Sequence, residues 1–488
     1  MNEKRISIAE VVYFLYFGIM FGAKACGLYE GMLIYNISIL AGMLLFGLKV
    51  LLTEHTLLEY IVMALLLIMC LLVYMNTGEK GLLFYMTLML GMKRVSLARM
   101  EKWAATIVGL CFTALSFLSI TGIIDGKHTT SANRFFGGEL LRHYLGYPNC
   151  NVTHTTFVIL LMLIVLVRGY RGKKDLIITS VFLYAINIYI YIYTMSTTGL
   201  IASTVFFVAL LYAYRRETIC NVDRALLLLL YPLCMFVSIG LPLLIKGDLF
   251  WELDSILHNR MNYPHYWLTH EPVTPFGVRF GEAPNTDYYI DSSFLYSFLQ
   301  LGVIPCIILT ALMLGMIYNL IKQNRRTEVA IFTALCVLGL SDPFFYNLAY
   351  KNILFLFIGD MFFGWIGKLE SRLPEMFGKK IRILPLGAKE ISYGNSFLYK
   401  IWTKAWSLLD NIISINGFKH FIILAALSLV LFVAAYFLIA PDSVVGAVDT
   451  IDEWEYLRKT LSIGVWVSGL AVMVVTWADG RKNTGGNI

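Results

Sequence analysis

The chain has 488 residues, of which 58% are hydrophobic and 15% are charged, and its formal net charge is +7. A soluble protein must cover its surface largely with polar and charged groups, so this composition excludes a soluble globular fold. The basic residues are dispersed between apolar segments instead of forming one patch, which excludes nucleic acid as the expected partner.

Apolar segments recur along the chain at about the 20-residue length that crosses a hydrocarbon core of roughly 30 Å. Because membrane-embedded backbone must satisfy its own hydrogen bonds, we predict an all-α polytopic membrane protein with about 12–14 transmembrane helices. The first segment follows MNEKR and has no small-residue cleavage site, so we interpret it as an uncleaved helix. The predicted spans are residues 8–25, 31–52, 57–75, 80–92, 104–124, 153–167, 176–194, 197–213, 225–245, 293–320, 328–342, 352–367, 419–440 and 460–477.

The distribution of lysine and arginine predicts the orientation of these spans. With a cytoplasmic N-terminus, 28 of the 39 basic residues fall on the cytoplasmic side and 11 on the other. Cytoplasmic loops normally carry this excess of positive charge. We therefore expect both termini in the cytoplasm.

The chain divides into three predicted regions. Residues 1–367 form a polytopic membrane core with external loops at 125–152 and 246–292. Residues 368–417 form a basic cytoplasmic linker, in which Trp402 and Trp406 lie one helical turn apart beside lysines, as in a helix that lies in the membrane interface. Residues 418–488 form a C-terminal transmembrane hairpin and tail, to which the sequence assigns no chemistry.

The two long external loops are the segments most suited to function, because binding residues tend to lie on loops held by a rigid scaffold. Six of the eight histidines lie between residues 128 and 270, five of them in these loops. The second loop has seven acidic and three basic residues. Passive extracellular loops are the alternative interpretation.

Four arginines stand in these loops, on the side where the charge rule disfavours them: Arg134, Arg142, Arg260 and Arg279. Arginine is a permanent cation whose planar fork binds phosphate or carboxylate through two parallel hydrogen bonds. Each arginine can instead form a structural ion pair with a loop acid, and for Arg134 we expect the ion pair.

Several motifs are absent from the sequence. It has no Walker A loop, no C-x-x-C pair, and in the external loops no H-E-x-x-H, G-x-S-x-G or D-x-D motif. We therefore expect no metal, no cofactor and no nucleotide hydrolysis, so the energy for any reaction must arrive with the substrate. The eight cysteines suggest no disulfide framework, and we interpret them as small packing residues.

Three short motifs resemble those of the O-antigen polymerase and ligase superfamily. Residues 142–149 (RHYLGYPN) resemble its arginine-glycine-proline-asparagine signature, and residues 196–199 (STTG) are similar to its Ser-x-Thr-Gly. Arg260, residues 275–277 (PFG) and residues 291–302 resemble its large external loop and the following helix. The resemblance covers roughly residues 140–365, whereas residues 1–125 match only in hydropathy.

The resemblance implies a GT-C-like helical membrane glycosyltransferase that inverts configuration and needs no metal. Its donor would be an oligosaccharide on undecaprenyl diphosphate, and it would polymerise repeat units into an O-antigen or capsule-type surface polysaccharide. The reaction would take place on the outer face of a bacterial cytoplasmic membrane. Membrane lipid, a flippase and a chain-length regulator would be its partners.

The resemblance also suggests roles for individual residues. Arg260 and then Arg142 would stabilise the negative charge on the departing diphosphate. Asp291, at the entry to a span, would be the general base that accepts the proton of the attacking hydroxyl. Ligases of the superfamily commonly have a histidine near this point, so the aspartate favours a polymerase. The remaining candidate substrate contacts are Arg279, Asn149, His154, Asp287 and His265.

Alternatives remain open at each level. Asp287, His154, His265 and His270 are rival bases, and Asn149, Ser196 and Thr197 are equally suited to capping helices. Ligase-type transfer to another acceptor and transport of the same lipid-linked glycan are the competing functions, followed by a non-catalytic assembly or sensor protein. A transporter normally places its polar groups at mid-membrane, whereas this sequence concentrates them in two outer loops.

Overall fold

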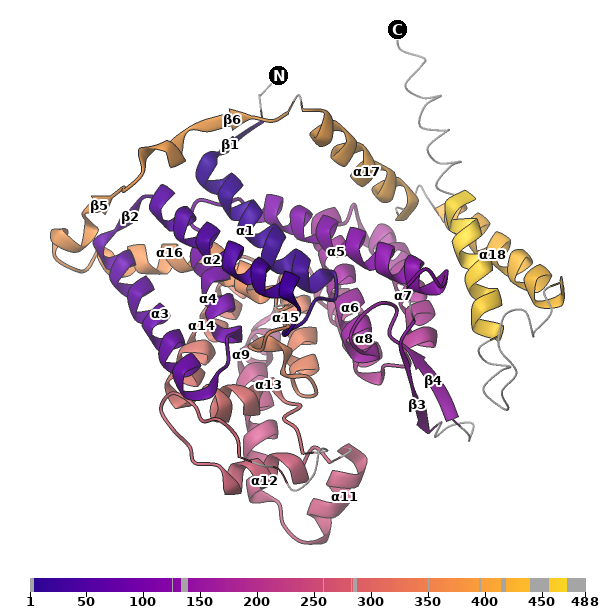
Figure 1. Ribbon diagram of the computed structural model, residues 1–488, viewed down its shortest axis with the longest axis horizontal. Coiled ribbons are helices and arrows are strands. Elements are labelled where there is room, and N and C mark those ends of the chain that lie inside the picture. Colours follow the sequence, from indigo (N-terminus) through magenta and orange to yellow (C-terminus); the bar gives the residue numbers. More distant parts are fainter. Residues whose placement is uncertain are drawn as a thin grey trace.

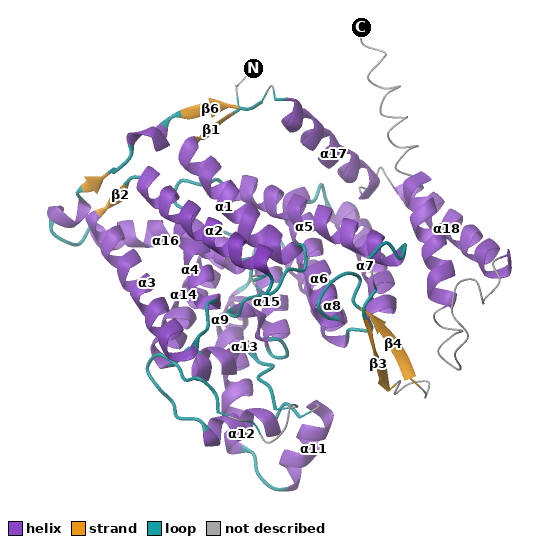
Figure 2. Ribbon diagram, viewed as in Figure 1, coloured by secondary structure: helices purple, strands orange, loops and turns teal. Residues whose placement is uncertain are grey.

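The computed structural model describes residues 4–124, 126–132, 139–257, 259–281, 283, 288–349, 351–394, 396–413, 418–438 and 456–471. Within these ranges the chain is a bundle of helices with three two-stranded sheets (Figures 1 and 2). The sheets join β1 (Arg5–Ser7) to β6 (Glu390–Ser392), β2 (His55–Thr56) to β5 (Lys380–Ile381), and β3 (His128–Ala132) to β4 (Glu139–His143), all antiparallel.

The helices follow the predicted spans closely in the first half of the chain. They are α1 (Ile8–Ala25), α2 (Leu33–Leu52), α3 (Leu57–Thr77), α4 (Gly81–Gly91), α5 (Leu97–Ile120), α6 (Cys150–Arg168), α7 (Lys173–Thr194), α8 (Thr197–Ala213) and α9 (Asn221–Met235). A π-helical turn, η1 (Phe236–Gly240), and α10 (Leu241–Leu244) continue α9. The largest difference is at α5, which begins seven residues before the predicted span at 104.

The second half contains α11 (Asp248–Leu257), α12 (Asn262–His270), α13 (Ser293–Leu295), the π-helix η2 (Tyr296–Gln300), α14 (Val303–Lys322), α15 (Arg326–Gly339), the 3₁₀ turn η3 (Pro343–Phe345), α16 (Leu354–Glu370), the 3₁₀ turns η4 (Glu375–Gly378) and η5 (Pro385–Ala388), α17 (Phe397–Ile413) and α18 (Phe418–Leu438). Residues 456–471 are also helical. α4 is buried over its whole length and lies against α16, α3 and α2. It therefore forms the centre of the bundle.

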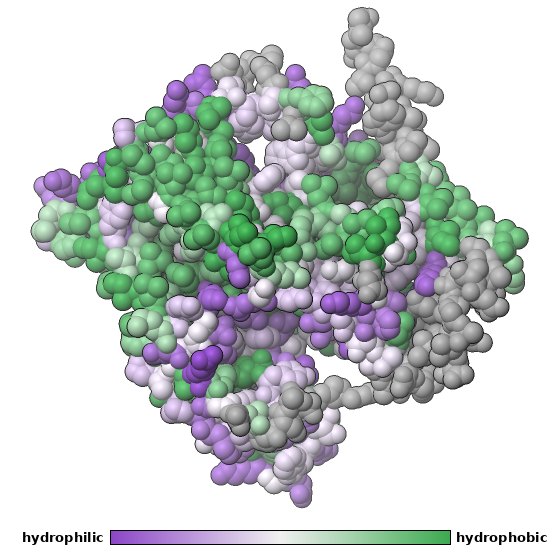
Figure 3. Space-filling view, in the orientation of Figure 1, coloured by the Kyte–Doolittle hydropathy of each residue, from purple (hydrophilic) through white to green (hydrophobic). Residues whose placement is uncertain are grey.

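Eight of the described helices are long and apolar enough to cross a membrane, and α4, α8 and residues 422–438 are shorter apolar helices. The outward faces of these helices are apolar: Leu33, Leu40 and Leu44 of α2 are 74%, 64% and 68% exposed. Figure 3 shows hydrophobic side chains spread over the region of α1, α2 and α3. Side chains of this kind face lipid in a membrane protein, which confirms the prediction of an all-α polytopic membrane protein.

The predicted single span over 293–320 is wrong, because the helix is broken before Val303. Gly302 adopts φ +96°, and a Cβ at this position would lie 2.2 Å from the backbone nitrogen of Gly277. Gly277 has φ +79°, and its own Cβ would lie 2.0 Å from the carbonyl oxygen of Gln300. Only glycine fits such a conformation at such a close approach.

The break attaches the second long loop to the membrane core. The carbonyl oxygen of Thr274 accepts a hydrogen bond from the N–H of Val303 at 3.0 Å, and that of Pro275 accepts one from Ile304 at 3.1 Å. These N–H groups begin α14 and would otherwise have no partner within the helix.

The two predicted long loops lie at one end of the molecule. β3 and β4 belong to the first loop and α11 and α12 to the second, and both project from the end opposite β1 and β6 (Figure 1). The antiparallel pairing of β1 with β6 and of β2 with β5 places residues 380–392 at the end of the bundle where α1 and α3 begin. The loops and the basic segment therefore occupy opposite ends of the bundle, as the charge pattern predicts.

Candidate functional site

Arg260 lies in the turn between α11 and α12, and the side chain of Asp254 fixes the shape of that turn. One carboxylate oxygen of Asp254 accepts hydrogen bonds from the N–H groups of Met261 at 2.9 Å and Asn262 at 2.8 Å. The guanidinium of Arg260 is thereby held 3.5 Å from the carboxylate of Asp291. Two residues selected from the sequence alone are thus brought together.

The guanidinium of Arg260 retains capacity for a ligand. Its Nη1 donates to the carbonyl of Leu257 at 3.2 Å, whereas its Nε is buried and has no hydrogen-bond partner in the described part of the chain. The side chains of Arg260 and Asp291 are 32% and 29% exposed, so both are accessible from the loop end.

Asp291 stands where the second loop enters the bundle. The next residue, Ser292, caps α13 by accepting a hydrogen bond from the N–H of Phe294, and its hydroxyl contacts Ser238 of η1 at 2.8 Å. Burial raises the pKa of Asp291 to about 6, and the neighbouring charge of Arg260 lowers that pKa in part. A carboxyl group with a pKa near the working pH is suited to act as a general base.

Two further charged residues belong to this region, Asp342 and Lys351. Neither was among the candidates predicted from the sequence. Asp342 accepts a hydrogen bond from the N–H of Phe344, and its carbonyl oxygen accepts one from Ser293 at 2.6 Å. Burial raises the pKa of Asp342 and lowers that of Lys351, and their opposite charges counteract both shifts. The negative charge of Asp291 also raises the pKa of Asp342.

Lys351 is 7% exposed and connects this acidic group to the first loop. Its ammonium donates to the carbonyl oxygen of Val152, in the first turn of α6, at 2.9 Å. Its backbone N–H donates at 3.0 Å to the hydroxyl of Tyr85, a residue of the central helix α4. The sequence signal is an Asp-Pro pair at the end of the predicted span 328–342 and a lysine just before the span 352–367.

Arg142, on β4, is engaged with the ends of neighbouring helices. Its Nε donates to the carbonyl of Thr194 at 3.2 Å, and its Nη2 donates to the side chain of Asn151 at 3.0 Å. The hydroxyl of Ser196 donates to the same oxygen of Asn151 at 2.9 Å. Among the described residues no hydrogen bond or ion pair links the contacts of Arg142, which are Thr194 and Asn151, to those of Arg260, which are Leu257 and Asp291.

Other candidates from the first loop have structural partners. Asn149 caps α6 by accepting a hydrogen bond from the N–H of Val152 at 2.8 Å, and Ser196 caps α8. His154 is fully buried and lies 3.0 Å from the side chain of Asn187. These contacts favour the capping and packing interpretations over substrate binding.

In the second loop, Nδ1 of His265 lies 2.8 Å from the carbonyl of Pro242, and the ring of His270 stacks on Tyr266 with centroids 4.1 Å apart. Arg279 is exposed. Asp287 and Arg134 lie outside the described residues.

No group of three or more His, Cys, Asp or Glu residues in the described ranges is arranged to hold a metal ion. The arrangement instead combines a permanent cation, Arg260, with a carboxyl group, Asp291, whose pKa is about 6, beside Asp342 and Lys351, whose charges influence each other. Comparisons with known protein families, characterised proteins and solved structures gave no match. The fold and the site therefore define a polytopic helical membrane protein with a charged site at its loop-bearing end.

Proposed function

We propose that this protein is a glycosyltransferase that joins oligosaccharide units carried on a lipid diphosphate, at the outer face of the membrane. The observation that carries the proposal is the Arg260–Asp291 pair, held 3.5 Å apart where the second loop enters the bundle. A lipid-linked donor brings its diphosphate to the membrane surface, and α11 and α12, which flank Arg260, lie at one end of the bundle (Figure 1).

The two residues supply what the reaction needs. Asp291 takes the proton of an acceptor hydroxyl, whose oxygen forms a bond to the anomeric carbon of the donor sugar. The bond from that carbon to the diphosphate oxygen breaks, the lipid diphosphate leaves, and the configuration inverts. Arg260 stabilises the negative charge on the departing oxygen, and preorganised donors of this kind usually make the largest contribution to such catalysis.

The contact between Arg260 and Asp291 leaves the guanidinium able to bind a substrate, because both side chains are partly exposed and their separation is wide. The 3.5 Å separation is longer than a charge-assisted hydrogen bond of about 2.7–2.9 Å, so the ion pair is loose. The atom of Arg260 that faces Asp291 is Nη2, on a guanidinium that is 32% exposed. A diphosphate can therefore bind the guanidinium while the carboxylate turns to the acceptor.

One observation favours a transporter as the second candidate. The helix is broken before Val303 and a π-helical turn interrupts the segment from Asn221 to Leu244, and transporters commonly place discontinuous helices at their substrate sites. In this chain the break is linked to a long loop at the end of the bundle, which suits a surface reaction better.

The experiment is to place purified protein in liposomes with a lipid-diphosphate oligosaccharide and to separate the products by gel electrophoresis. A ladder of lengths would support polymerisation, and a single transfer to a different acceptor would support a ligase. Movement of the glycan across the bilayer without any new glycosidic bond would overturn the proposal in favour of transport.

A further inference from the structure

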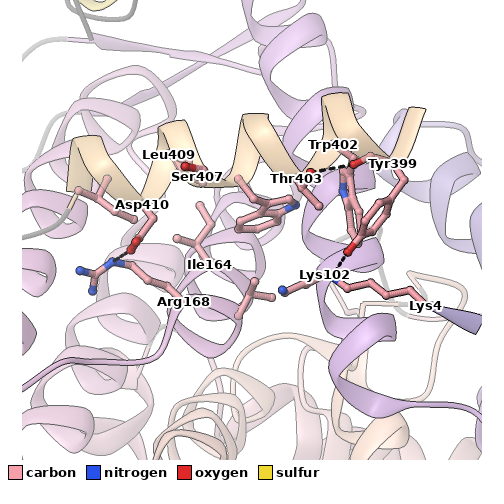
Figure 4. A pocket seen from close by; sticks show the side chains of 13 residues that line it. Lys4, Lys102, Ile164, Arg168, Tyr399, Trp402, Thr403, Ser407, Leu409 and Asp410 are labelled. Atoms are coloured by element: carbon pink, nitrogen blue, oxygen red, sulfur yellow. Dashed lines mark hydrogen bonds and ion pairs between the residues drawn. The ribbon is translucent and has the colours of Figure 1, made fainter. Parts of the chain in front are cut away.

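A cavity lies at the opposite end of the bundle from Arg260. It has a volume of about 320 Å³, is partly open, and lies between α17 and the helices α5 and α6 (Figure 4). Cavities that bind small ligands typically hold about 300–1,000 Å³. Nothing in the proposed glycan transfer uses this site.

α17 is fixed across the cavity by contacts at both ends and in the middle. At one end Asp410 forms ion pairs with Arg168 at 2.9 Å and with Arg171 at 2.5 Å. At the other end Tyr399 contacts Lys4, whose ammonium lies 4.9 Å from the ring centroid. The helix therefore forms a fixed wall of the cavity.

Two tryptophans hold the middle of α17. The indole nitrogens of Trp402 and Trp406 donate to the hydroxyl of Thr106, on α5, at 2.8 and 3.2 Å. Both rings line the cavity. Tryptophan side chains favour the boundary between the hydrocarbon and the headgroups of a membrane, where one part of the ring is dry and its N–H is wet.

The position of the cavity along the spans agrees with that boundary. Lys102 lies in the second turn of α5, and Arg168 is the last residue of α6. Both helices are candidate membrane spans, so the cavity stands where the spans end. A ligand at this depth meets hydrocarbon on one side and water on the other.

The lining combines cationic and apolar groups. Lys4 and Lys102 extend toward the same end of the cavity (Figure 4), and Ile164 and Val167 of α6 form its apolar wall. In the described part of the chain the Lys102 ammonium has no hydrogen-bond or ion-pair partner. The one carboxylate in the lining, that of Asp410, is already paired with Arg168 and Arg171.

We propose that this cavity binds an anionic phospholipid, with the phosphate of the headgroup at Lys4 and Lys102 and the start of its acyl chains against Trp402, Ile164 and Val167. A lysine without a partner in the described part of the chain, facing a partly open cavity, suits an anion. The apolar wall and the two tryptophans suit an amphiphile better than a free phosphate ion, which would gain nothing from them. Juxtamembrane basic residues attract anionic lipids in the same way.

The test is to titrate delipidated protein in detergent with phosphatidylglycerol or phosphatidylcholine and to count bound lipids by native mass spectrometry. We expect phosphatidylglycerol to bind more tightly than phosphatidylcholine. Lys102→Gln and Lys4→Gln should each weaken binding of phosphatidylglycerol about fivefold and leave binding of phosphatidylcholine unchanged. The exposed position of both lysines makes misfolding of these variants unexpected, and each reports on the site independently.

The matched control is Lys404→Gln, which removes a lysine of α17 that does not line the cavity. Its affinity for phosphatidylglycerol should equal that of the unmodified protein. An equal loss in Lys404→Gln, or no loss in Lys102→Gln and Lys4→Gln, would overturn the site. Inorganic phosphate that binds with the same dependence on Lys102 and displaces the lipid would assign the cavity to a free anion and overturn the lipid proposal.

Discussion

The carboxylate of Asp291 lies 3.5 Å from the guanidinium of Arg260, and the two influences on its protonation oppose each other. Burial disfavours the charged carboxylate, whereas the guanidinium favours it. Burial prevails, so the pKa of Asp291 rises to about 6. The proposed base is therefore protonated in mildly acidic solution and ionised at neutral pH.

This pKa predicts how glycan transfer depends on pH. A general base acts only when deprotonated, so kcat/KM should fall about tenfold for each pH unit below about 6 and level off above it. Asp291→Asn should remove this dependence and lower the rate by roughly 10²–10⁴-fold. The measurement is initial rate against pH between 5 and 8. A flat profile in the unmodified protein would assign the base elsewhere, first to Asp287.

How much of the structure the sequence predicts depends on how far apart in the chain the interacting residues lie. Hydropathy is local, so helices such as α1 and α8 are predicted within a residue or two at both ends. The selection of Arg260 and Asp291 rests on a family resemblance, and the sequence did not predict that they contact each other. Asp342 and Lys351 were missed because their relation to Asp291 depends on the packing of α13 beside η3.

The break at Gly302 was missed for a related reason. Residues 293–320 form a continuous apolar run, and hydropathy alone predicts one span. The break depends on the approach of Gly277, which lies in a different segment of the chain. Local sequence signals do not contain such a long-range contact.

That contact predicts the effect of Gly302→Ala. Alanine at φ +96° costs roughly 1–2 kcal/mol, and its Cβ would overlap the backbone nitrogen of Gly277 at 2.2 Å. We expect a lower thermal unfolding temperature and loss of glycan transfer, because the second loop would detach from α14. Gly364→Ala is the control, since α16 is helical there and no atom lies within 4 Å of an added Cβ. Equal stability of the two variants would contradict the proposed attachment.

The second prediction about mechanism concerns metal ions. If Arg260 stabilises the departing diphosphate, no divalent cation is needed for that role. Glycan transfer should therefore proceed at an unchanged rate in EDTA, measured after dialysis against the chelator. Loss of activity that magnesium or manganese restores would refute the arginine mechanism and make Asp291 and Asp287 candidate ligands.

Orientation in the membrane is a separate prediction. The excess of basic residues at the end of the bundle that contains β1 and β6 predicts that this end faces the cytoplasm. A reporter that works only outside the cytoplasm should be active when fused after residue 140 or 270 and inactive after residue 380. The reverse pattern would place the site of Arg260 in the cytoplasm, where the proposed lipid-linked donor is not presented for polymerisation.

The last prediction separates charge from geometry at Arg260. Lysine retains the positive charge but lacks the planar fork that binds a diphosphate through two parallel hydrogen bonds. Loss of one preorganised donor at a developing negative charge costs roughly 2.7–4 kcal/mol, or a factor of about a hundred to a thousand in rate. Arg260→Lys should therefore be severely impaired and Arg260→Ala should be near background, measured as initial rates with protein of equal thermal stability.

The pH profile distinguishes the two variants further. Because Arg260 lowers the pKa of Asp291, its replacement by alanine should move the acid limb of the residual activity to higher pH, whereas lysine should leave the limb near about 6. Arg134→Ala, which removes an arginine that we expect to be structural, should keep most of its activity. Near-normal polymerisation by Arg260→Ala would show that the arginine is only an ion-pair partner of Asp291. The phosphate-binding role would then pass to Arg142 or Arg279.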